Sequence, residues 1–394
     1  MLSKNDIQFI KESIAPRTAP VLSIYFDANP AEPTNQKRGW LVRVKDTLKG
    51  LDLPRGLTPK VVHELEQIIP AAHTYVVFAD DADLIKIYAL QVDLPVVDLA
   101  HSRIEVRWGE PYVFPLVYAI DEYSRQGVVL LDKAKWHFYT MHLGEIHEVA
   151  DAFLDIPRDH TRKDEKRPAM RFEQGVVLRG GAEGDRYERH IEASVVRFYK
   201  HNVSVLEKLV AAWHIDELIF MGPNEDTRFF ENYLPRALRQ KVIGQAPSLP
   251  KPDPSAGEVL QKVAPIIQEK MQATERALLD EIRDVGRWTI PTVLNDLQMG
   301  RLHLLVAPWK VKGDVLRCAR GLVVEDERAA EAYCPGQATQ QIPLSDVLPD
   351  LAAAHGARLE FVHGEAESRL LTEFGGLAGL SRWRRIKEDE HDET

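Results

Sequence analysis

The sequence predicts a three-domain α/β protein, and three observations support this class. The chain has 394 residues, which suits roughly two to four domains. Short runs of β-branched and aromatic residues alternate with segments in which apolar residues recur at helical spacing. A linker at 245–255 carries four prolines, which stiffen a chain without adding to a core and so mark a domain boundary.

The N-terminal domain is predicted over residues 1–110 as a small α/β unit. Val21–Phe26, Thr74–Ala79 and Leu84–Leu90 are rich in β-branched and aromatic residues and predict strands. Gln36–Leu48 places its apolar residues at helical spacing. Four cations around that helix form a candidate basic face, with an ordinary solvated face as the alternative: Lys37, Arg38, Arg43 and Lys45.

The central domain is predicted over residues 111–247. Val113–Ile120, Gly127–Leu131 and Lys135–Met141 predict three consecutive strands joined by turns. After a long polar stretch, the pattern predicts a helix, a strand and a second helix, which are Ile191–Trp213, Glu217–Met221 and Asp226–Leu238.

The C-terminal domain is predicted over residues 248–386, followed by an acidic tail at 387–394. It begins with a long helix at Ala256–Ile282. Helices and strands then alternate, which predicts a three-layer α/β arrangement: helix Ile290–Leu297, strand Leu302–Ala307, helix Ser345–Ala354 and strand Arg358–Val362.

Composition and charge exclude several classes of protein. Apolar residues make up 44% of the chain and charged residues 28%, which is ordinary for a globular protein. The net charge of −10 excludes a protein held to nucleic acid by bulk charge, but it leaves a local basic site open. The sequence shows neither a signal-peptide core nor an apolar run long enough to span a membrane. We therefore expect a cytoplasmic protein that does not bind or span a membrane.

The polar stretch from Pro157 to His190 is the least expected part of the chain. A structureless stretch of this length inside a domain is usually functional or disordered. Between Pro157 and Arg171 it has six cations and three anions, a net charge of +3. Paired glycines at 180 and 181 allow close approach of a backbone, and arginines bind phosphates with forked donors. A phosphate-rich partner is predicted, with a solvated loop as the alternative. The candidate residues are Arg162, Lys163, Lys166, Arg167, Arg171, Arg179 and Arg186.

Several motifs in one order resemble a known family. Gly180-Gly-Ala-Glu-Gly-Asp-Arg-Tyr187 lies where the family has Gly-Gly-Gln followed, at the same spacing, by Arg-Phe. Leu116–Asp121, Phe230–Arg239 and Phe374–Trp383 resemble further segments of it. The stretch from Tyr112 to Trp383 thus resembles the archaeo-eukaryotic class-one release factors and Pelota. It resembles more closely their bacterial relatives, the group with the Balon-like ribosome hibernation factors.

The resemblance implies a fold and a function. It implies a central release-factor-like domain with a long exposed loop and a C-terminal domain of the ribosomal-protein-L7Ae type. It further implies binding in the vacant aminoacyl site of the ribosome, in hibernation or rescue, with the loop directed to the peptidyl transferase centre. The implied partners are rRNA of both subunits, tRNA, and a translational GTPase such as elongation factor Tu. The N-terminal cations would then face small-subunit rRNA.

One departure from the family pattern bears on activity. Ala182 occupies the position of the Gln in Gly-Gly-Gln, and its side chain has no polar group that could position a water. We therefore expect no peptide release and assign no catalytic residue. Two alternatives stay open: a peptidyl-tRNA hydrolase that uses another water-positioning group, and a protein that kept the fold but no longer binds ribosomes.

No cofactor or metal is predicted. The sequence contains no P-loop, no Gly-x-Gly-x-x-Gly after a strand and no His-Glu-x-x-His. Some archaeal relatives carry two cysteine pairs that bind zinc in the insertion where Cys318 and Cys334 stand. Here the second cysteine of each pair is missing, so two free thiols are expected. Even a single bridge between them would be poor grounds for predicting secretion.

Overall fold

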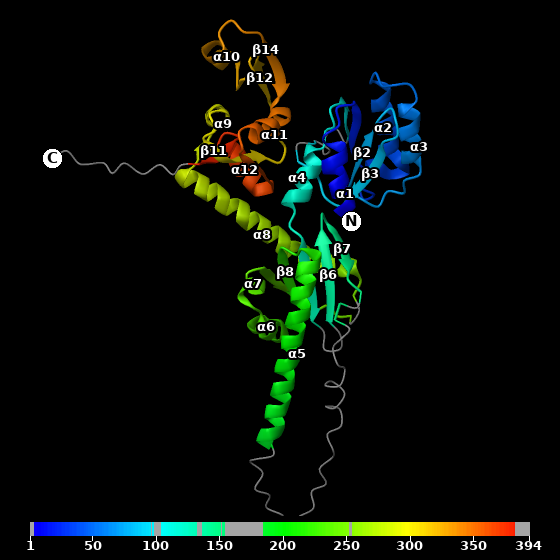
Figure 1. Cartoon of the computed structure of the whole chain (residues 1–394), viewed down its shortest axis with the longest axis vertical. Coiled ribbons are helices and arrows are strands. Elements are labelled where there is room, and N and C mark those ends of the chain that lie inside the picture. The colour runs from blue at the N-terminus through cyan, green and yellow to red at the C-terminus, as the bar shows by residue number, and fades with distance from the viewer. Residues whose placement is uncertain are drawn as a thin grey trace, which may run out of the picture. The chain divides into compact units, whose positions relative to one another are not determined.

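The computed structural model of the chain is a mixed α/β structure (Figure 1) with two compact units. One unit consists of Met1–Glu122 together with Glu269–Thr394, and the other of Tyr123–Gln268. The structure describes residues 4–95, 97, 104–131, 136–150, 152–153, 184–251 and 254–382, and for 184–198 it describes the backbone alone. The predicted α/β class is confirmed. The predicted division into 1–110, 111–247 and 248–386 stays a prediction, and the tail at 387–394 lies outside the described residues.

The N-terminal part of the first unit is an antiparallel sheet in the order β3-β2-β1-β4. Every residue of β1 and β2 is buried. Phe26 of β1 stacks between Trp40 and Tyr75, with ring centroids 5.2 and 5.5 Å away, and so joins the sheet to α2. The elements are α1 (Lys4–Phe9), η1 (Ile10–Ile14), β1 (Val21–Asp27), η2 (Pro33–Arg38), α2 (Gly39–Lys49), α3 (Leu57–Glu66), β2 (Thr74–Ala79), β3 (Ile85–Leu90) and β4 (Ile104–Gly109).

The C-terminal part of the first unit contains two sheets, in the orders β10-β16-β11-β15 and β13-β12-β14. Apolar residues of α8 and α12 form a core with β11 and β16. Strand β11 is parallel to β15 and antiparallel to β16. Helix α8 (Ala256–Val285) belongs to this unit from Glu269 onward, and its first half belongs to the second unit. The other elements are β10 (Arg287–Trp288), α9 (Ile290–Gln298), β11 (Leu302–Pro308), β12 (Asp314–Cys318), β13 (Val323–Val324), α10 (Glu327–Tyr333), β14 (Thr339–Pro343), α11 (Leu344–Ala354), β15 (Arg358–Val362), α12 (Gly364–Glu373) and β16 (Ala378–Ser381).

Helix α4 (Phe114–Glu122) corrects one sequence-based expectation, because Val113–Ile120 was predicted to be a strand. A short continuous apolar run has no periodicity that separates a buried strand from a buried helix. Pro115 in the first turn is compatible with a helix, where its missing N–H is not needed. The hydroxyl of Tyr118 accepts a hydrogen bond from the backbone N–H of Phe361 (3.0 Å), and the two rings lie 4.8 Å apart. These contacts hold α4 against β15 within the first unit.

The second unit is a five-stranded mixed sheet in the order β7-β6-β5-β8-β9. Its elements are β5 (Gln126–Leu131), β6 (Trp136–His142), β7 (Glu145–Glu148), α5 (Gly184–Trp213), β8 (Glu217–Met221), α6 (Asn224–Tyr233), α7 (Arg236–Arg239) and β9 (Val242–Ala246). Val129 and Leu131 pack with α5, whereas Val128 and Leu130 pack with the first half of α8. Burial on both faces explains why β5 is an unbroken apolar run.

The prediction of a single helix over Asp226–Leu238 is wrong in one respect, because the structure has two helices there, α6 and α7. Pro235 lies between the two helices. A proline disfavours helical backbone at the preceding residue, and Leu234 is indeed extended, with ψ 136°. By contrast, the strands predicted at Thr74–Ala79, Glu217–Met221 and Arg358–Val362 are confirmed with the same bounds.

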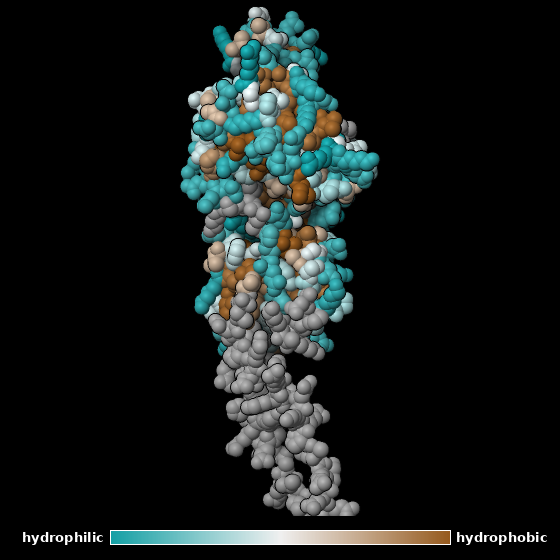
Figure 2. Space-filling model, turned by 90° about the vertical axis from the view of Figure 1, so that its right-hand side faces the viewer, coloured by the Kyte–Doolittle hydropathy of each residue, from teal (hydrophilic) through white to brown (hydrophobic). Residues whose placement is uncertain are grey.

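Most large apolar side chains are interior, and the face in Figure 2 is mainly hydrophilic with smaller apolar patches. Trp40, Tyr139 and Phe220 are among the largest side chains that are almost completely buried. Among the described residues, no helix has the length and apolar character needed to cross a membrane.

Helix α8 begins with a reciprocal capping arrangement. The backbone N–H and the hydroxyl of Ser255 donate to Oε2 of Glu258 (2.9 Å each), and the Glu258 N–H donates back to the Ser255 hydroxyl (3.4 Å). Lys251 Nζ also lies 2.7 Å from Oε1 of Glu258. The hydrogen bonds from Lys251 and Ser255 lower the pKa of Glu258 to about 2.

This lowered pKa predicts a pH-dependent contribution to stability. Since the folded-state pKa of Glu258 lies below its unfolded value of about 4.3, the contribution is present above that value. It is lost as the pH falls from about 4.5 to about 2. We expect Glu258→Gln to lower the free energy of unfolding at pH 6 and to differ less from the unaltered protein at pH 3. Urea unfolding at several pH values measures this, and a constant difference would contradict the assignment.

Candidate functional site: the base of the central loop

The predicted binding loop joins β7 to α5, and most of its predicted residues lie outside the described residues. These are Arg162, Lys163, Lys166, Arg167, Arg171, Arg179, Gly180, Gly181 and Ala182. The polar stretch was predicted to reach His190, but the structure begins α5 at Gly184, so Arg186 belongs to the first turn of that helix, where only the backbone is described. The Gly-Gly-Ala segment therefore directly precedes the start of a long helix in the sequence.

Helix α5 is the structural support for this end of the loop. It has 30 residues, which corresponds to a length of about 45 Å. Figure 1 shows that its N-terminal half extends beyond the sheet of the second unit and beyond α6 and α7. Its C-terminal half packs on the sheet through Val203, Leu206 and Val210. The helix thus holds residue 184 at a distance from the packed body of this unit.

An aromatic cluster joins the segment before the loop and the second half of α5 to the sheet. Trp136 of β6 contacts Phe153, the last described residue before the loop, with ring centroids 5.5 Å apart. Trp136 also contacts Phe230 of α6 (4.8 Å) and Tyr199 of α5 (6.0 Å). Phe153 is buried and Phe230 is fully buried. One tryptophan therefore packs against both the last described residue before the loop and the middle of the helix that follows it, so these two points belong to the core of the second unit.

The same cluster continues to the surface. The rings of Tyr199 and Tyr233 stack with centroids 5.6 Å apart and an angle of 7° between their planes. Phe229 meets both edge-on at 5.2 Å and is 44% exposed. Burial, together with the charge of Asp226, raises the pKa of Tyr199. Exposed aromatic rings of this kind can stack on nucleic-acid bases.

These surface aromatics were not predicted as functional from the sequence. In the sequence, Phe230 stands out only as part of Phe230–Arg239, a segment that carries the family resemblance. The one available signal was the spacing of residues 229, 230 and 233, which places three aromatic rings on neighbouring positions of a helix.

A pair of phenylalanines on α6 tests the structural role of the cluster. Phe230→Ala should lower the free energy of unfolding by about 3 kcal/mol or more, because it removes a fully buried ring between Trp136 and Phe220. The matched variant Phe229→Ala should cost about 1 kcal/mol or less, since that ring is partly in solvent. Urea denaturation followed by tryptophan fluorescence measures both. Equal losses would show that the buried ring of Phe230 contributes no more to stability than the partly exposed ring of Phe229.

The turn after β8 is held by groups of the chain itself. A Cβ atom at Gly222 would lie 2.8 Å from the carbonyl oxygen of Leu131, so only glycine fits there without a shift. The Thr227 hydroxyl lies 3.1 Å from the carbonyl oxygen of Asn224 and 3.1 Å from Oε1 of Gln245. The turn is therefore a junction between strand β8 and helix α6, and its polar groups already bond to the chain itself, so it is not a binding loop for a phosphate.

The four predicted cations of the N-terminal domain differ in their surroundings. Arg43 donates to the carbonyl oxygens of Thr34 (3.1 Å) and Asp27 (3.3 Å) and to the side chain of Asn35. Lys45 pairs with Glu66 at 2.7 Å, which lowers the pKa of that carboxyl group. Arg38 donates to the Glu66 carbonyl oxygen at 3.0 Å, and Lys37 is exposed. Arg38 and Lys45 therefore both contact Glu66, whereas Arg43 donates hydrogen bonds to the segment that precedes α2.

The expectation of two free thiols is wrong, because Cys318 and Cys334 form a disulfide. Their Cα atoms lie 6.5 Å apart, within the range that a disulfide can bridge. The folded chain brings together two cysteines that are 16 residues apart in sequence. A zinc site does not fit these residues, since both sulfurs are bonded to each other. Within the described ranges, no group of three or more His, Cys, Asp or Glu side chains could hold a metal ion.

Comparison with known proteins finds a family match in the central part of the chain. The family model of bacterial archaeo-eukaryotic release factor family 10 matches residues 111–268. No curated protein matches the chain in sequence.

Several solved structures match most of the chain at low identity and low TM-score. An archaeal translation termination factor, aRF1, is 16% identical, covers 97% of this chain and 98% of its own, and has a TM-score of 0.25. Pelota of Archaeoglobus fulgidus is 11% identical, covers 97% and 93%, and has a TM-score of 0.36. Dom34 of S. cerevisiae, a translation termination-like factor, is 13% identical, covers 80% and 87%, and has a TM-score of 0.37.

The matched residues 111–268 include β5 to β9, α5 and the loop that precedes it. They contain both the Gly-Gly-Ala segment and the aromatic cluster at the base of the loop. The predicted relationship to the bacterial archaeo-eukaryotic release factors is therefore confirmed over residues 111–268.

Proposed function

We propose that this protein binds the ribosome at the vacant aminoacyl site, with its central loop directed to the peptidyl transferase centre. The observation that carries the proposal is the family 10 match across the loop and its supporting helix. The net charge of +3 between Pro157 and Arg171 supports it, because rRNA is a phosphate-rich partner. The acidic remainder of the chain would limit binding to unrelated RNA.

The structure of the second unit suits this role. A 30-residue helix can carry a short segment into a narrow site while the folded body stays outside. The aromatic cluster at the base would keep the helix from pivoting on the sheet when the loop meets its target. Gly180 and Gly181 would allow the backbone to approach RNA closely.

The protein would act by occupying the site and not by hydrolysis. Ala182 has only a methyl side chain, so it can neither donate nor accept a hydrogen bond to a water. Hibernation or rescue of idle ribosomes in the cytoplasm is the corresponding role. The proposed partners are rRNA of both subunits, tRNA and a translational GTPase such as elongation factor Tu.

Competition for the aminoacyl site tests this proposal. The protein should sediment with vacant ribosomes at low salt and should be displaced when aminoacyl-tRNA fills the aminoacyl site first. Ribosomes carrying tRNA only in the peptidyl site serve as the control and should still bind. Equal binding to filled and vacant sites would exclude this mode of occupancy, and failure to sediment at any salt concentration would favour a protein that no longer binds ribosomes.

The retained Gly180-Gly181 pair favours one alternative, a peptidyl-tRNA hydrolase that uses a different water-positioning group. Such an enzyme would release peptide from ribosomes carrying peptidyl-tRNA without puromycin. Loss of that release in Gly181→Ala would support the enzyme, whereas no release by the unaltered protein supports occupancy.

A further inference from the structure

A small subdomain in the C-terminal part of the chain has very little apolar core of its own. It consists of β12, β13, α10 and β14, and we call it the disulfide subdomain. Its buried core residues are Cys318, Val324, Ala330 and Cys334, with Leu316, Leu322 and Ala329 packed against them. Because two of the four buried residues are the bonded cysteines, the disulfide accounts for much of the cohesion of this subdomain.

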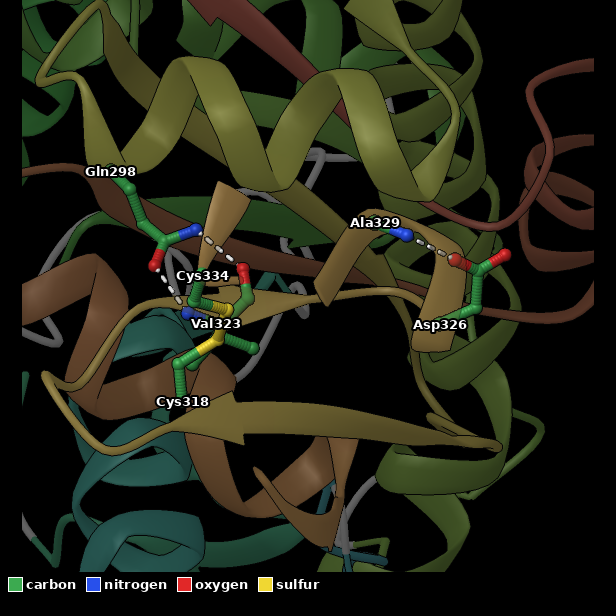
Figure 3. Close-up of a disulfide and its surroundings, with 6 residues drawn as sticks. All are labelled: Gln298, Cys318, Val323, Asp326, Ala329 and Cys334. Atoms are coloured by element: carbon green, nitrogen blue, oxygen red, sulfur yellow. Dashed lines mark hydrogen bonds between the residues drawn. A yellow bond between two sulfur atoms is a disulfide. The ribbon is translucent and has the colours of Figure 1, made fainter. Parts of the chain in front are cut away.

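The two cysteines occupy the ends of two different elements (Figure 3). Cys318 is the last residue of β12, and Cys334 directly follows α10. Their side chains are 2% and 3% exposed. The bond therefore joins a strand to a helix and closes the chain segment between them, which limits how far α10 can move from the sheet.

Helix α9 is attached to the same subdomain by one side chain. Nε2 of Gln298 donates to the carbonyl oxygen of Val323 (2.8 Å), and the Val323 N–H donates to Oε1 of Gln298 (2.8 Å). Figure 3 shows this double hydrogen bond beside the disulfide. Asp326 also caps α10 by accepting a hydrogen bond from the Ala329 N–H (2.8 Å).

A pocket of about 280 Å³ lies between α9 and the disulfide subdomain. One wall includes Leu294, Asn295 and Gln298 of α9. The other includes Val323 of β13 and Tyr333, which immediately precedes Cys334. The position of the second wall therefore depends on the element that the disulfide fastens.

We propose that Cys318 and Cys334 are a reversible thiol–disulfide pair whose redox state controls the order of the disulfide subdomain and of this pocket. The oxidant is a low-molecular-weight disulfide such as oxidised glutathione. When the subdomain opens and exposes the pair, one cysteine thiolate attacks the oxidant and expels one thiolate. The second cysteine thiolate then attacks the mixed disulfide and expels the other thiolate. The protein loses two electrons and two protons, and the oxidant becomes two thiols.

Reduction acts locally because the main core does not depend on these cysteines. Leu279, Val306 and Leu370 belong to a separate core formed by α8, β11 and α12. Two reduced cysteines are still small apolar residues that can remain buried. The bond therefore controls how often the subdomain opens, while the rest of the C-terminal part stays folded.

Titration of the full-length protein with glutathione tests the chemistry. Samples equilibrated at increasing ratios of oxidised to reduced glutathione are alkylated after denaturation and weighed by mass spectrometry. As the share of oxidised glutathione rises, we expect the reduced protein, which carries two alkyl groups, to be replaced by the disulfide form, which carries none. A pair that stays fully bonded in excess reduced glutathione, or fully reduced in excess oxidised glutathione, would overturn the proposal.

Hydrogen exchange of the same samples tests the structural consequence. In the reduced protein, amides of 314–334 and of α9 should exchange about tenfold faster or more, whereas β11 and β15 should not change. The double variant Cys318→Ser/Cys334→Ser should exchange like the reduced protein in either buffer. Equal exchange in oxidised and reduced protein would overturn control of the pocket. This outcome is independent of ribosome binding, so it does not bear on the proposed function.

Discussion

Replacing Lys166, Arg167 and Arg171 together with alanine should weaken ribosome binding by about two to three orders of magnitude at 0.1 M salt. Each phosphate contact contributes about 0.9 to the slope of log affinity against log salt concentration, so losing three lowers the slope by about 3. Sedimentation with ribosomes at several salt concentrations measures both the affinity and the slope. The fall in slope distinguishes lost phosphate contacts from a general loss of folding.

A matched variant controls for the change in net charge. Lys262, Lys270 and Arg276 are exposed on α8, and replacing all three with alanine makes the same change in charge outside the loop. We expect this variant to keep nearly the affinity and slope of the unaltered protein. If the two triple variants lose affinity equally, the loop is not the binding element. If neither loses affinity, the loop lies outside the interface.

Ala182→Gln should produce peptide release that the unaltered protein lacks, with a rate at least about a hundredfold above background. The substitution completes the Gly-Gly-Gln motif of the resembled family and adds an amide that can accept from and donate to a water. A single well-placed polar group at a reacting centre changes rates by about two to three orders of magnitude. Release of labelled peptide from ribosomes carrying peptidyl-tRNA measures the gain.

Ala182→Met is the matched control for this substitution. Methionine has an unbranched side chain similar in length to that of glutamine but no amide, so it should bind ribosomes and release nothing. Equal release by both variants would show that bulk and not hydrogen bonding matters. Release by neither, with ribosome binding intact, would show that residue 182 does not lie where the family places its glutamine.

The agreement between predicted and observed elements depends on how each element is buried. Arg358–Val362 is confirmed because charged and apolar residues alternate along it, and Glu217–Met221 is confirmed because turn residues bound it on both sides. Phe114–Glu122 is a helix because its apolar residues contact partners such as Phe361, which lies more than 200 residues away in sequence. The sequence around Phe114–Glu122 does not show that it packs against Phe361, so this short apolar run could not be assigned to a strand or a helix from the sequence.

Some residues of the candidate site can likewise be found from the sequence, and others only from the structure. The loop, its cations and the Gly-Gly-Ala segment can be found from the sequence, because charge, glycine pairing and length are properties of a continuous segment. The aromatic cluster could not be found in this way, since Trp136, Phe153, Tyr199 and Phe230 come from four separate segments. The roles of Arg43 and Lys45 also became visible only with their partners, Asn35 and Glu66.

The sequence by itself was enough to predict the α/β class, the acidic net charge, the basic segment and the relationship of residues 111–268 to the release factors, because composition and the order of motifs can be read without knowing which residues are in contact. Only the tertiary structure decided that Cys318 and Cys334 form a bond and that Gln298 of α9 is fastened to Val323 beside them. The physical reason is that a disulfide needs Cα atoms within about 7 Å of each other, and that distance is set by how β12 and α10 pack.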